Sequence, residues 1–237
     1  MEGAAIESVP AVSDIVIGSG ITKSFGRGSA AVQVLKGVDI AIPSGALIAF
    51  KGRSGSGKTT LINLLSALDR PDSGQVLFEG HDLTGMSDKE RDGVRRTRMG
   101  LIFQSFALIP LMSAYENVEF VLRVSGYPAQ ERQSAAEGAL EQVGLKSRMS
   151  HRPFELSGGE QQRTAIARAI AHKPRLLLAD EPTAELDSRT GLQIMKIFRD
   201  LVETAGMTII MTTHDPAIME IVDRVYELED GVIVVSS

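Results

Sequence analysis

The sequence predicts an α/β fold in which a largely parallel sheet is interrupted by a helical insert. A strand pattern, a glycine-rich loop and a helical pattern follow one another at Ala46–Phe50, Gly52–Thr60 and Thr60–Leu65. Strand and helix patterns alternate again from Arg175 onward, and this alternation is typical of a parallel sheet. Between these two parts, the stretch from Ser87 to Ile170 has a helical pattern rich in Ala, Glu, Gln and Arg.

Length and composition limit the class of protein. The 237 residues fit one large domain, or one domain with an insert. The chain is 43% hydrophobic and has no Trp, so we expect a mainly aliphatic core. The net charge of −5 and the lack of a basic run predict no nucleic-acid partner, because the short Arg95–Arg98 cluster fits a solvated helix face. The absence of Cys excludes a disulfide framework and a thiolate metal site, and it fits a reducing compartment.

The N-terminus and the hydropathy pattern bear on location. Met1–Val12 contains small residues and two glutamates, and it lacks the basic start and long apolar core of a signal peptide. No apolar run approaches the ~18 residues that a membrane-spanning helix needs. We therefore expect a cytosolic protein, or one that contacts a membrane only through its partners.

The N-terminal part is predicted to contain a group of short strands followed by the helix of the glycine-rich loop. Turns at 26–28 and 43–45 separate the first strands, and a turn at 69–74 follows the helix, which is expected to reach about Leu68. The predicted strands are Ile15–Ile21, Val34–Ile42, Ala46–Phe50 and Gln75–Phe78.

The C-terminal part is predicted to alternate between strands and helices. The predicted strands are Arg175–Ala179, Met207–Thr212, Arg224–Leu228 and Val232–Val235, and the predicted helices are Ser188–Glu203 and Pro216–Val222. Ligand chemistry in such a sheet gathers at the carboxyl ends of the strands, so polar residues directly after a strand are candidates for the site.

The glycine-rich loop spells GxxxxGK[ST] between a strand and a helix, which is the context of a phosphate-binding loop. Its members are Gly52, Arg53, Ser54, Gly55, Ser56, Gly57, Lys58, Thr59 and Thr60. The glycines allow backbone N–H groups to surround a polyphosphate, and the helix N-terminus adds its dipole. Lys58 is expected to reach the β- and γ-phosphates and the Thr59 hydroxyl to bind Mg²⁺. The alternative is an ordinary turn before a helix, but the complete motif favours a nucleoside triphosphate.

Two carboxylates end the apolar strand pattern that begins at Arg175. Asp180 is expected to hold Mg²⁺, directly or through water, and Glu181 to orient or deprotonate the attacking water. An apolar strand that ends in Asp-Glu is weak evidence by itself, because strands commonly end in polar turns. Together with the phosphate-binding loop it predicts hydrolysis of the triphosphate.

Three Ser-x-x-Glu patterns occur, at Ser87, Ser113 and Ser157, and each is first of all a helix capping box. For Ser87/Glu90 and Ser113/Glu116, capping is the expected role. Only Ser157 is followed by two glycines and a Gln-Gln-Arg run. The glycines allow a phosphate to approach the helix end, with the Ser157 hydroxyl as an additional donor.

The segment Leu156–Arg163 resembles the signature motif of ATP-binding cassette (ABC) ATPases, and the resemblance extends along nearly the whole chain from Ile15. It implies a single ABC ATPase domain over 1–237 with a P-loop NTPase (RecA-like) core, an N-terminal antiparallel β subdomain and an inserted α-helical subdomain. The implied nucleotide-binding core covers about 1–103 and 165–237, and the implied insert covers about 104–164. Two such cassettes, as a homodimer or pseudo-dimer, would hold two ATP molecules between them. The residues implied to contact the γ-phosphate of the opposite subunit are Ser157, Gly158, Gly159, Glu160 and Gln161.

The same resemblance implies roles for four further residues. Gln104 matches the glutamine that senses Mg²⁺ and water and links the core to the insert, and His214 matches the switch histidine on the γ-phosphate. Phe25 stands where an aromatic ring stacks on adenine, although a place in the core is the alternative. Asp187 matches an aspartate at the dimer contact. Glu185 departs from the pattern, because a small or uncharged residue is more usual there.

The remaining histidines, His81, His151 and His172, have no ligand-like spacing, so no protein-only metal site is predicted. The resemblance of Arg96–Gln104 and Phe106–Val118 to cassettes of lipoprotein-release and macrolide- or peptide-export permeases implies transport. We therefore expect an ATPase at the cytoplasmic face of the membrane that drives a separate transmembrane permease, exporting or extracting lipoprotein, lipid, peptide or drug-like cargo. The alternatives are a cell-division-type regulatory cassette and a soluble ABC ATPase without transport.

Overall fold

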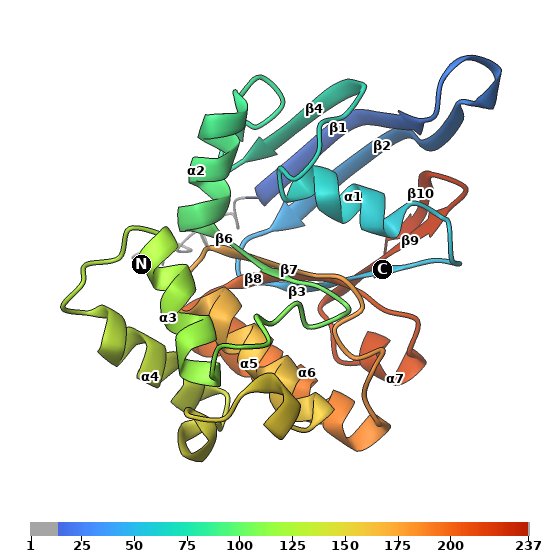
Figure 1. Cartoon of the computed structure of the whole chain (residues 1–237). Helices are drawn as coiled ribbons and strands as arrows, with labels where there is room; N and C mark the ends of the chain where they lie inside the picture. The colour runs from blue at the N-terminus through green and yellow to red at the C-terminus, as the bar shows by residue number, and fades with distance from the viewer. Residues whose placement is uncertain (1–13, 237) are drawn as a thin grey trace, which may run out of the picture.

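The computed structural model describes residues 14–236, which form two sheets with helices on either side of the larger one (Figure 1). The antiparallel sheet has the order β2-β1-β4-β5 and contains β1 (Asp14–Phe25), β2 (Val32–Pro43), β4 (Ser73–Phe78) and β5 (His81–Asp82). The second sheet has the order β10-β9-β3-β8-β7-β6 and contains β3 (Leu47–Lys51), β6 (Met99–Ile102), β7 (Leu176–Ala179), β8 (Thr208–Thr212), β9 (Arg224–Glu229) and β10 (Val232–Ser236). Its strands are parallel except for β10.

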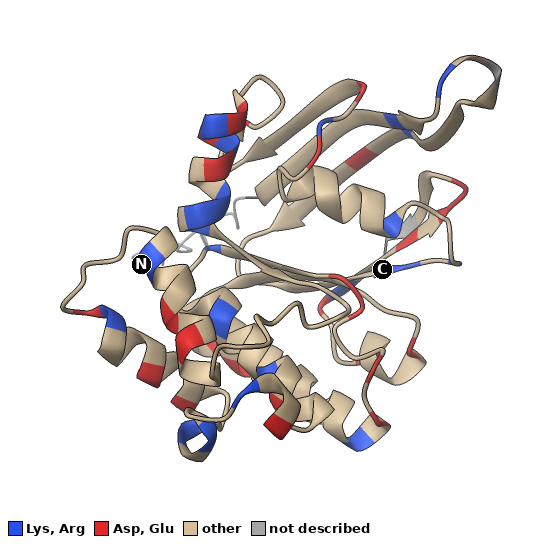
Figure 2. Ribbon diagram, in the orientation of Figure 1, with Lys and Arg blue, Asp and Glu red and all other residues tan. Residues whose placement is uncertain are grey.

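The helices of the described residues lie in two layers. α1 (Lys58–Leu65) lies between the two sheets, and α2 (Asp88–Arg98) leads from the antiparallel sheet to β6 (Figure 1). The other helices are α3 (Ala114–Val124), α4 (Arg132–Gln142), α5 (Gly158–Ile170), α6 (Ser188–Ala205) and α7 (Pro216–Met219). Figure 2 shows the charged residues mainly on these outer helices and on loops, with both signs on α2.

The strands β3, β6, β7 and β8 contribute side chains to two cores, because successive side chains point to opposite faces. Leu47 and Leu177 face the core that contains α3, α4, α5 and α6, whereas Ile48 and Leu178 face the core that contains α1 and the antiparallel sheet. Both faces of the sheet are therefore covered, which explains why β3, β7 and β8 are continuous apolar runs.

The predicted β elements are confirmed; β1, β2 and β4 are longer than predicted, whereas β3 has the predicted length and is shifted by one residue. The prediction of a continuous helical stretch over 87–170 is wrong, because β6 lies inside it as an edge strand of the parallel sheet. Gly100 on β6 explains part of the misreading: it is a weak strand former, but a Cβ there would lie 2.4 Å from the Ala169 carbonyl oxygen of α5. The helix expected to reach Leu68 ends at Leu65 instead, and Ala67 has a left-handed backbone. The short strand β5 was not predicted.

In the described part of the chain, no helix combines the length and the hydropathy that are needed to cross a membrane.

Candidate functional site

The carboxyl ends of three adjacent parallel strands, β3, β8 and β7, define the candidate site. β3 leads into the phosphate-binding loop, β7 leads into Asp180 and Glu181, and β8 leads to His214. In the ladder, Phe50 pairs with Thr212 and Ala179 pairs with Met211, so these three strand ends lie side by side. The predicted catalytic and phosphate-binding residues therefore converge on one edge of the sheet.

The backbone of the phosphate-binding loop depends on its glycines. Gly57 is the N-cap of α1 with φ of 105°, and Gly55 has φ of 80°, both in the region that favours glycine. At Gly52 a Cβ would lie 2.3 Å from the Leu228 carbonyl oxygen and 2.6 Å from Ser56 Oγ. The loop is thus packed directly against β9, and its neighbours leave no space for a side chain at Gly52.

Lys58 is buried, and its ammonium group is held by the loop itself. Lys58 Nζ donates to the carbonyl oxygens of Gly52 at 2.7 Å and Arg53 at 3.1 Å. Burial lowers the pKa of Lys58 below its usual value, while the charges of Glu181 and Asp180 act in the opposite direction. The ammonium group therefore faces a site with two nearby carboxylates, which is suited to a ligand whose negative charge is partly neutralised by a cation.

The hydroxyl of Thr212 connects the two carboxylate residues. Thr212 Oγ1 donates to Asp180 Oδ1 at 2.7 Å, and the same oxygen accepts from the backbone N–H of Glu181 at 2.7 Å. Thr212 itself is fully buried at the end of β8. These hydrogen bonds fix the start of the loop after β7. They involve Asp180 Oδ1 and not Oδ2, the other oxygen of that carboxylate. Thr212 was not among the predicted site residues.

Glu181 and His214, which follow the paired strands β7 and β8, face each other. The distance from His214 Nε2 to Glu181 Oε1 is 2.8 Å. Glu181 has a left-handed backbone with φ of 45°, an uncommon conformation for a residue with a side chain. Such conformations cluster at functional sites, where the surrounding structure holds them in place.

Two open pockets meet at His214. One, of about 560 Å³, is formed by the phosphate-binding loop, β9 and the turn after it; its lining is Lys51 to Ser56, His214, Met219 and Glu227 to Asp230. The other, of about 240 Å³, is lined by Glu181, Asp187, Thr212 and His214, among others. Neither of these two pockets includes a residue of 157–161 in its lining.

Gln104 and Phe25 lie at the margins of the site. Gln104 is exposed two residues beyond β6, whose Ile102 pairs with Ala179 of β7, so the chain emerges beside the Asp180 edge. Phe25 is the last residue of β1 and is 49% exposed, which rules out the alternative of a core position.

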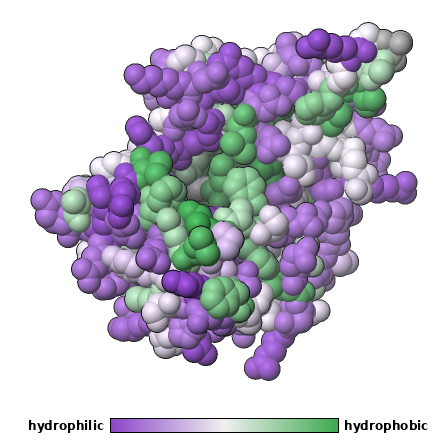
Figure 3. Space-filling model, viewed as in Figure 1, coloured by the Kyte–Doolittle hydropathy of each residue, from purple (hydrophilic) through white to green (hydrophobic). Residues whose placement is uncertain are grey.

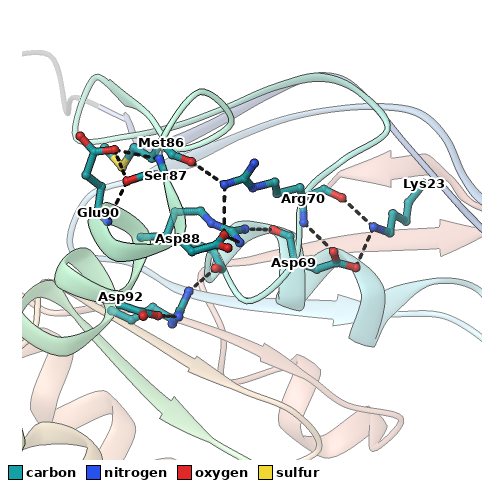
Figure 4. A network of polar contacts seen from close by, with 11 residues as sticks. Lys23, Asp69, Arg70, Met86, Ser87, Asp88, Glu90 and Asp92 are labelled. Atoms are coloured by element: carbon teal, nitrogen blue, oxygen red, sulfur yellow. Dashed lines mark hydrogen bonds and ion pairs between the residues drawn. The ribbon is translucent and has the colours of Figure 1, made fainter.

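Lys23 supports the Phe25 ring, since its Nζ lies 5.5 Å from the ring centroid. Lys23 in turn pairs with Asp69 at 2.8 Å and donates to the Arg70 carbonyl oxygen at 2.7 Å (Figure 4). The ring is therefore tied, through Lys23, to the segment that follows α1. Sequence reasoning missed Lys23, whose only signal is its position two residues before the aromatic ring.

The segment 157–161 forms the first turn of α5. Ser157 is the N-cap, and the capping box with Glu160 is complete. Gly159 allows α5 to approach the first turn of α6, because a Cβ at Gly159 would lie 2.5 Å from Thr190 Cγ2. Gln161 Nε2 donates to the Leu156 carbonyl oxygen at 3.1 Å. The predicted capping boxes at Ser87 and Ser113 are confirmed.

Asp187 is exposed and is the N-cap of α6. Its Oδ1 accepts from the Thr190 N–H at 3.0 Å and its Oδ2 accepts from Thr190 Oγ1 at 2.6 Å. Hydrogen bonds from Thr190 are the main reason why the pKa of Asp187 is below its usual value. Because Thr190 also lies against Gly159, the N-termini of α5 and α6 are packed together and their predicted dimer contacts share one surface.

The donor set fits a magnesium ion bound jointly with a polyphosphate. The described residues contain no group of three or more His, Cys, Asp or Glu side chains that is able to hold a metal by itself. The exposed Thr59 hydroxyl and the second oxygen of Asp180 are hard oxygen ligands of the kind Mg²⁺ prefers. Mg²⁺ is usually held by one or two carboxylates together with substrate phosphates, which matches this arrangement.

A separate groove of about 600 Å³ lies between α2, β6, α3 and α5. Its floor contains the partly exposed side chains of Phe103, Phe120 and Val124, and Arg95, Arg96 and Arg168 contribute positive charge. Figure 3 shows a hydrophobic area in the middle of one face of the molecule, bordered by hydrophilic residues. The lining of the groove includes Phe103, which directly precedes Gln104 in the chain.

Asn117 organises the loop that runs from Gln104 to α3. It is fully buried; its Oδ1 accepts from the Ile109 N–H at 2.8 Å, and its Nδ2 donates to the carbonyl oxygens of Ile109, Met112 and Ser113. Sequence reasoning did not single out Asn117, because an Asn on a helix carries no signal of the backbone groups it will meet.

Comparison with known proteins places this geometry in a family. The family model described as "ABC transporter" matches residues 35–184. The chain belongs to the ABC transporter family. It is an ATP-binding cassette, and the predicted family, P-loop fold, ATP binding and ATPase activity are confirmed.

Relatives of this cassette include separate ATP-binding proteins and larger fused proteins. The chain is 45% identical over 221 residues to the lipoprotein-releasing system ATP-binding protein LolD 2 of Rhodopirellula baltica, covering 90% of this chain and 86% of that protein. It is 47% identical over 216 residues to the macrolide export ATP-binding/permease protein MacB of an Azoarcus species, covering 91% of this chain. The chain spans 33% of the length of that MacB protein.

A solved structure matches the cassette closely. It is the dimeric, post-hydrolysis state of the ATP-binding cassette MJ0796 bound to ADP and Pi, with 37% identity and a TM-score of 0.87. The match covers 94% of this chain and 97% of that one.

Proposed function

We propose that this cassette is the ATP-hydrolysing subunit of a transporter and works as a pair that encloses two ATP molecules. The observation that carries this proposal is the convergence of Lys58, Asp180, Glu181 and His214 at the carboxyl edge of β3, β7 and β8. The dimeric state of the related cassette MJ0796 supports pairing. The reaction is ATP + H₂O → ADP + phosphate, with catalysis mainly by positioning and charge stabilisation.

The residues of one cassette divide the work on the triphosphate. The loop from Gly52 to Thr60 holds the phosphates, and Lys58 neutralises charge on the β- and γ-phosphates. Glu181 orients or deprotonates the attacking water, and the 2.8 Å contact between Glu181 and His214 supports a role for the histidine at the same γ-phosphate. Gln104, two residues beyond β6, reports on the state of the phosphate.

Mg²⁺, when bound, would offset the negative charge that develops on the phosphate groups. Thr59 and Asp180 are the residues of this chain that would hold it, with Gln104 beside them. The Thr212 hydroxyl keeps Asp180 in position, because it donates to one carboxylate oxygen and leaves the other for the ion.

The second cassette completes each site. Ser157, Gly158, Gly159, Glu160 and Gln161 of one cassette contact the γ-phosphate held by the other, and Asp187 lies at the contact between them. The pocket at the phosphate-binding loop has no residue of 157–161 in its lining, which is consistent with this division. Phe25, half exposed and supported by Lys23, stacks on the adenine.

A transmembrane permease takes the groove between α2, β6, α3 and α5. The chemistry of the groove, an apolar floor with Arg95, Arg96 and Arg168 around it, fits a short helix with an apolar face and an acidic group. In this division, residues about 1–103 and 165–237 form the nucleotide-binding core, and about 104–164 form the helical subdomain, so the groove lies where they meet. The boundary at 165 falls within α5, which belongs to both parts.

The names of the relatives favour export or extraction as the process that ATP hydrolysis by this cassette drives. LolD 2 is named for lipoprotein release and MacB for macrolide export. We assign to this chain the same general class of cargo, namely lipoprotein, lipid, peptide or drug-like molecules, and a peripheral position on the cytoplasmic face of the membrane. A cell-division-type cassette that regulates its partner, and a soluble cassette without transport, are the alternatives.

The proposal is tested by affinity capture from membranes of the source organism with a tagged Glu181→Gln chain, with and without ATP. We expect an ATP-dependent catch of a multi-span protein with a large extracytoplasmic domain, identified by mass spectrometry. A catch that contains soluble proteins alone would contradict the transporter assignment and favour the non-transport alternative.

A pair of matched variants shows whether the groove is responsible. Val124 lies in the groove and is 50% exposed, whereas Val234 on β10 lies outside it and is 47% exposed. Val124→Asp should lose the membrane protein, and Val234→Asp should retain it. Equal loss in both variants would exclude the groove as the docking site.

A further inference from the structure

The proton of the Ser157 hydroxyl is already in use in the free cassette. Ser157 Oγ donates to Glu160 Oε2 at 2.9 Å, and it accepts from the Glu160 N–H at 3.3 Å. The Ser157 N–H donates to the same Glu160 Oε2 at 2.9 Å. A serine hydroxyl has one proton to give, so Ser157 has to release the Glu160 carboxylate before it donates to a phosphate.

The Glu160 carboxylate also places a negative charge at the helix end that is proposed to bind a polyphosphate. Hydrogen bonding from the Ser157 backbone, with help from Arg148, lowers the pKa of Glu160 to about 2, so the carboxylate is ionised at neutral pH. An uncompensated carboxylate would repel the incoming γ-phosphate and would bind the Ser157 proton more strongly. The helix end therefore needs a cation close to Glu160.

Arg148 is that cation. It lies in the 3₁₀ turn Lys146–Arg148 after α4, and its Nε donates to Glu160 Oε1 at 3.0 Å. It engages the carboxylate oxygen that Ser157 does not use, so the two contacts do not compete. The Glu160 side chain is only 18% exposed, which reduces screening of this pair by solvent.

The other two capping boxes lack this arrangement. Glu90 and Glu116 accept from the backbone N–H groups of Ser87 and Ser113 in the same way, yet within residues 14–236 no Lys or Arg forms a salt bridge with either of them. At Glu116 the charge of Arg152 acts without such a contact, as the last of the causes that shift its pKa. A capping box alone does not require a cation, so the role of Arg148 is not explained by helix capping.

We propose that Arg148 is a positioning residue for ATP-driven pairing, which acts by neutralising Glu160 so that Ser157 can turn its hydroxyl to the γ-phosphate of the opposite cassette. This inference rests on the proposed function, because it requires that Ser157 meets ATP held by a second cassette. Arg148 itself touches neither nucleotide nor Mg²⁺ in this scheme. Its effect is confined to pairing and leaves ATP binding by the single cassette unchanged.

The test is a double-mutant cycle in the Glu181→Gln background, with the ATP concentration at half-maximal dimer formation measured by light scattering. Arg148→Met should raise that concentration by about tenfold or more, which is the scale of a hydrogen bond to a charged group. Glu160→Gln removes the charge that Arg148 neutralises, so the double variant Arg148→Met/Glu160→Gln should behave like Glu160→Gln alone. Arg148→Lys keeps the charge and should retain most of the dimer.

The matched control is Lys146→Met. Lys146 lies in the same 3₁₀ turn and forms an exposed pair with Glu141 at 2.8 Å, away from Ser157. It should dimerise like the parent. Binding of a fluorescent ATP analogue to the monomer, at protein concentrations below dimerisation, should be the same in the parent, Arg148→Met, Arg148→Lys and Lys146→Met.

The outcomes separate this inference from the proposed function. A Glu181→Gln parent that stays monomeric with saturating ATP overturns the proposed function and the inference together. A parent that dimerises while Arg148→Met dimerises at the same ATP concentration overturns the inference alone. So does a defect in Arg148→Met that persists unchanged when Glu160→Gln is added, because Arg148 would then act through another group.

Discussion

At the scale of single residues, Thr212 shows how one hydroxyl arranges two catalytic positions. It donates to Asp180 and accepts from the backbone N–H of Glu181, so the ion-binding and water-activating residues share a support. Glu181 has a left-handed backbone at this point, and the hydrogen bond to Thr212 helps to hold it there. The precise direction of the Glu181 carboxylate therefore depends on a residue of the neighbouring strand.

Glu181→Gln is expected to bind ATP and to lose nearly all turnover. The amide cannot accept the proton of the attacking water, and general-base catalysis contributes about 10²–10⁴-fold. The measurement is phosphate release under saturating ATP, together with ATP affinity by calorimetry. Turnover near that of the unmodified chain would remove Glu181 from this role.

Glu185→Ala should increase the fraction of dimer formed with ATP. Glu185 is exposed in the loop between β7 and α6, two residues before Asp187, and it adds a negative charge to the surface proposed for pairing. Removal of a like charge from such a surface favours association. Light scattering at subsaturating ATP measures the effect, and an unchanged dimer fraction would show that Glu185 lies outside the contact.

At the scale of secondary-structure elements, the loop from Gln104 to α3 depends on its contact with a helix. The buried Asn117 supplies four hydrogen bonds to backbone groups of residues 109–113. The carbonyl oxygens of Ile109 and Ser113 also accept from the backbone N–H groups of Met112 and Asn117, so the Asn117 side chain matters most for the Ile109 N–H and the Met112 carbonyl oxygen. Loss of the partner of a buried polar group costs about 1–3 kcal/mol. The loop beside the groove is therefore shaped by α3 as well as by its own residues.

Asn117→Ala is expected to lower the free energy of unfolding by at least about 1–3 kcal/mol and to raise hydrogen exchange in 105–113. Leu111→Ala is the control in the same loop, because the Leu111 side chain is 81% exposed and should have little effect. Denaturant unfolding and hydrogen–deuterium exchange read out the two effects. Exchange in 105–113 that is equal in both variants would contradict the role of Asn117.

The elements that sequence alone predicted are those whose pattern is local. β3, β7 and β8 are continuous apolar runs because both faces of the sheet are covered, and the phosphate-binding loop is recognisable from its own residues. β6 was missed because its four residues contain a glycine and follow directly on α2, so they offer too little pattern to separate them from a helical stretch. The close packing of Gly100 against α5 is a tertiary contact, which the local sequence pattern does not reveal.

The candidate site was also predictable only in part. Lys58, Asp180 and His214 follow strand ends, and a parallel sheet brings such ends together. The contacts of Thr212 with Asp180 and of Lys23 with Phe25 were not predictable, because each depends on the relative position of neighbouring elements. The left-handed backbone of Glu181 is likewise set by residues that lie far away in the sequence.

At the scale of the whole molecule, the site lies where the two sheets are joined. The Tyr226 hydroxyl on β9 donates to the Ala41 carbonyl oxygen on β2 at 2.5 Å, and Tyr226 packs edge-on against Phe50 of β3. The N–H of Lys36 on β2 donates to the Gly231 carbonyl oxygen, in the turn between β9 and β10. A ligand held by the phosphate-binding loop therefore contacts a region on which both sheets depend.

ATP with Mg²⁺ should stabilise the whole cassette against heat. A ligand at 100 times its Kd adds about 2.7 kcal/mol to the free energy of unfolding. For a chain of this size each 1 kcal/mol raises the Tm by roughly 2–4 °C. We therefore expect a rise of roughly 5–10 °C in differential scanning fluorimetry, smaller when EDTA removes the metal. Lys58→Ala should abolish the rise, and a full rise in that variant would show that the nucleotide binds elsewhere.

The conformation of the loop after Gln104 limits how this segment can be transferred from one cassette to another. Phe106 and Ala107 both have left-handed backbones, and the guanidinium of Arg168 on α5 donates to both of their carbonyl oxygens, at 3.0 Å and 2.5 Å. The shape of the loop is thus encoded some sixty positions away in the sequence. A chimaera that grafts residues 104–113 onto another cassette transfers the amino-acid sequence of the loop but not its conformation, unless the recipient helix also has an arginine at the position of Arg168.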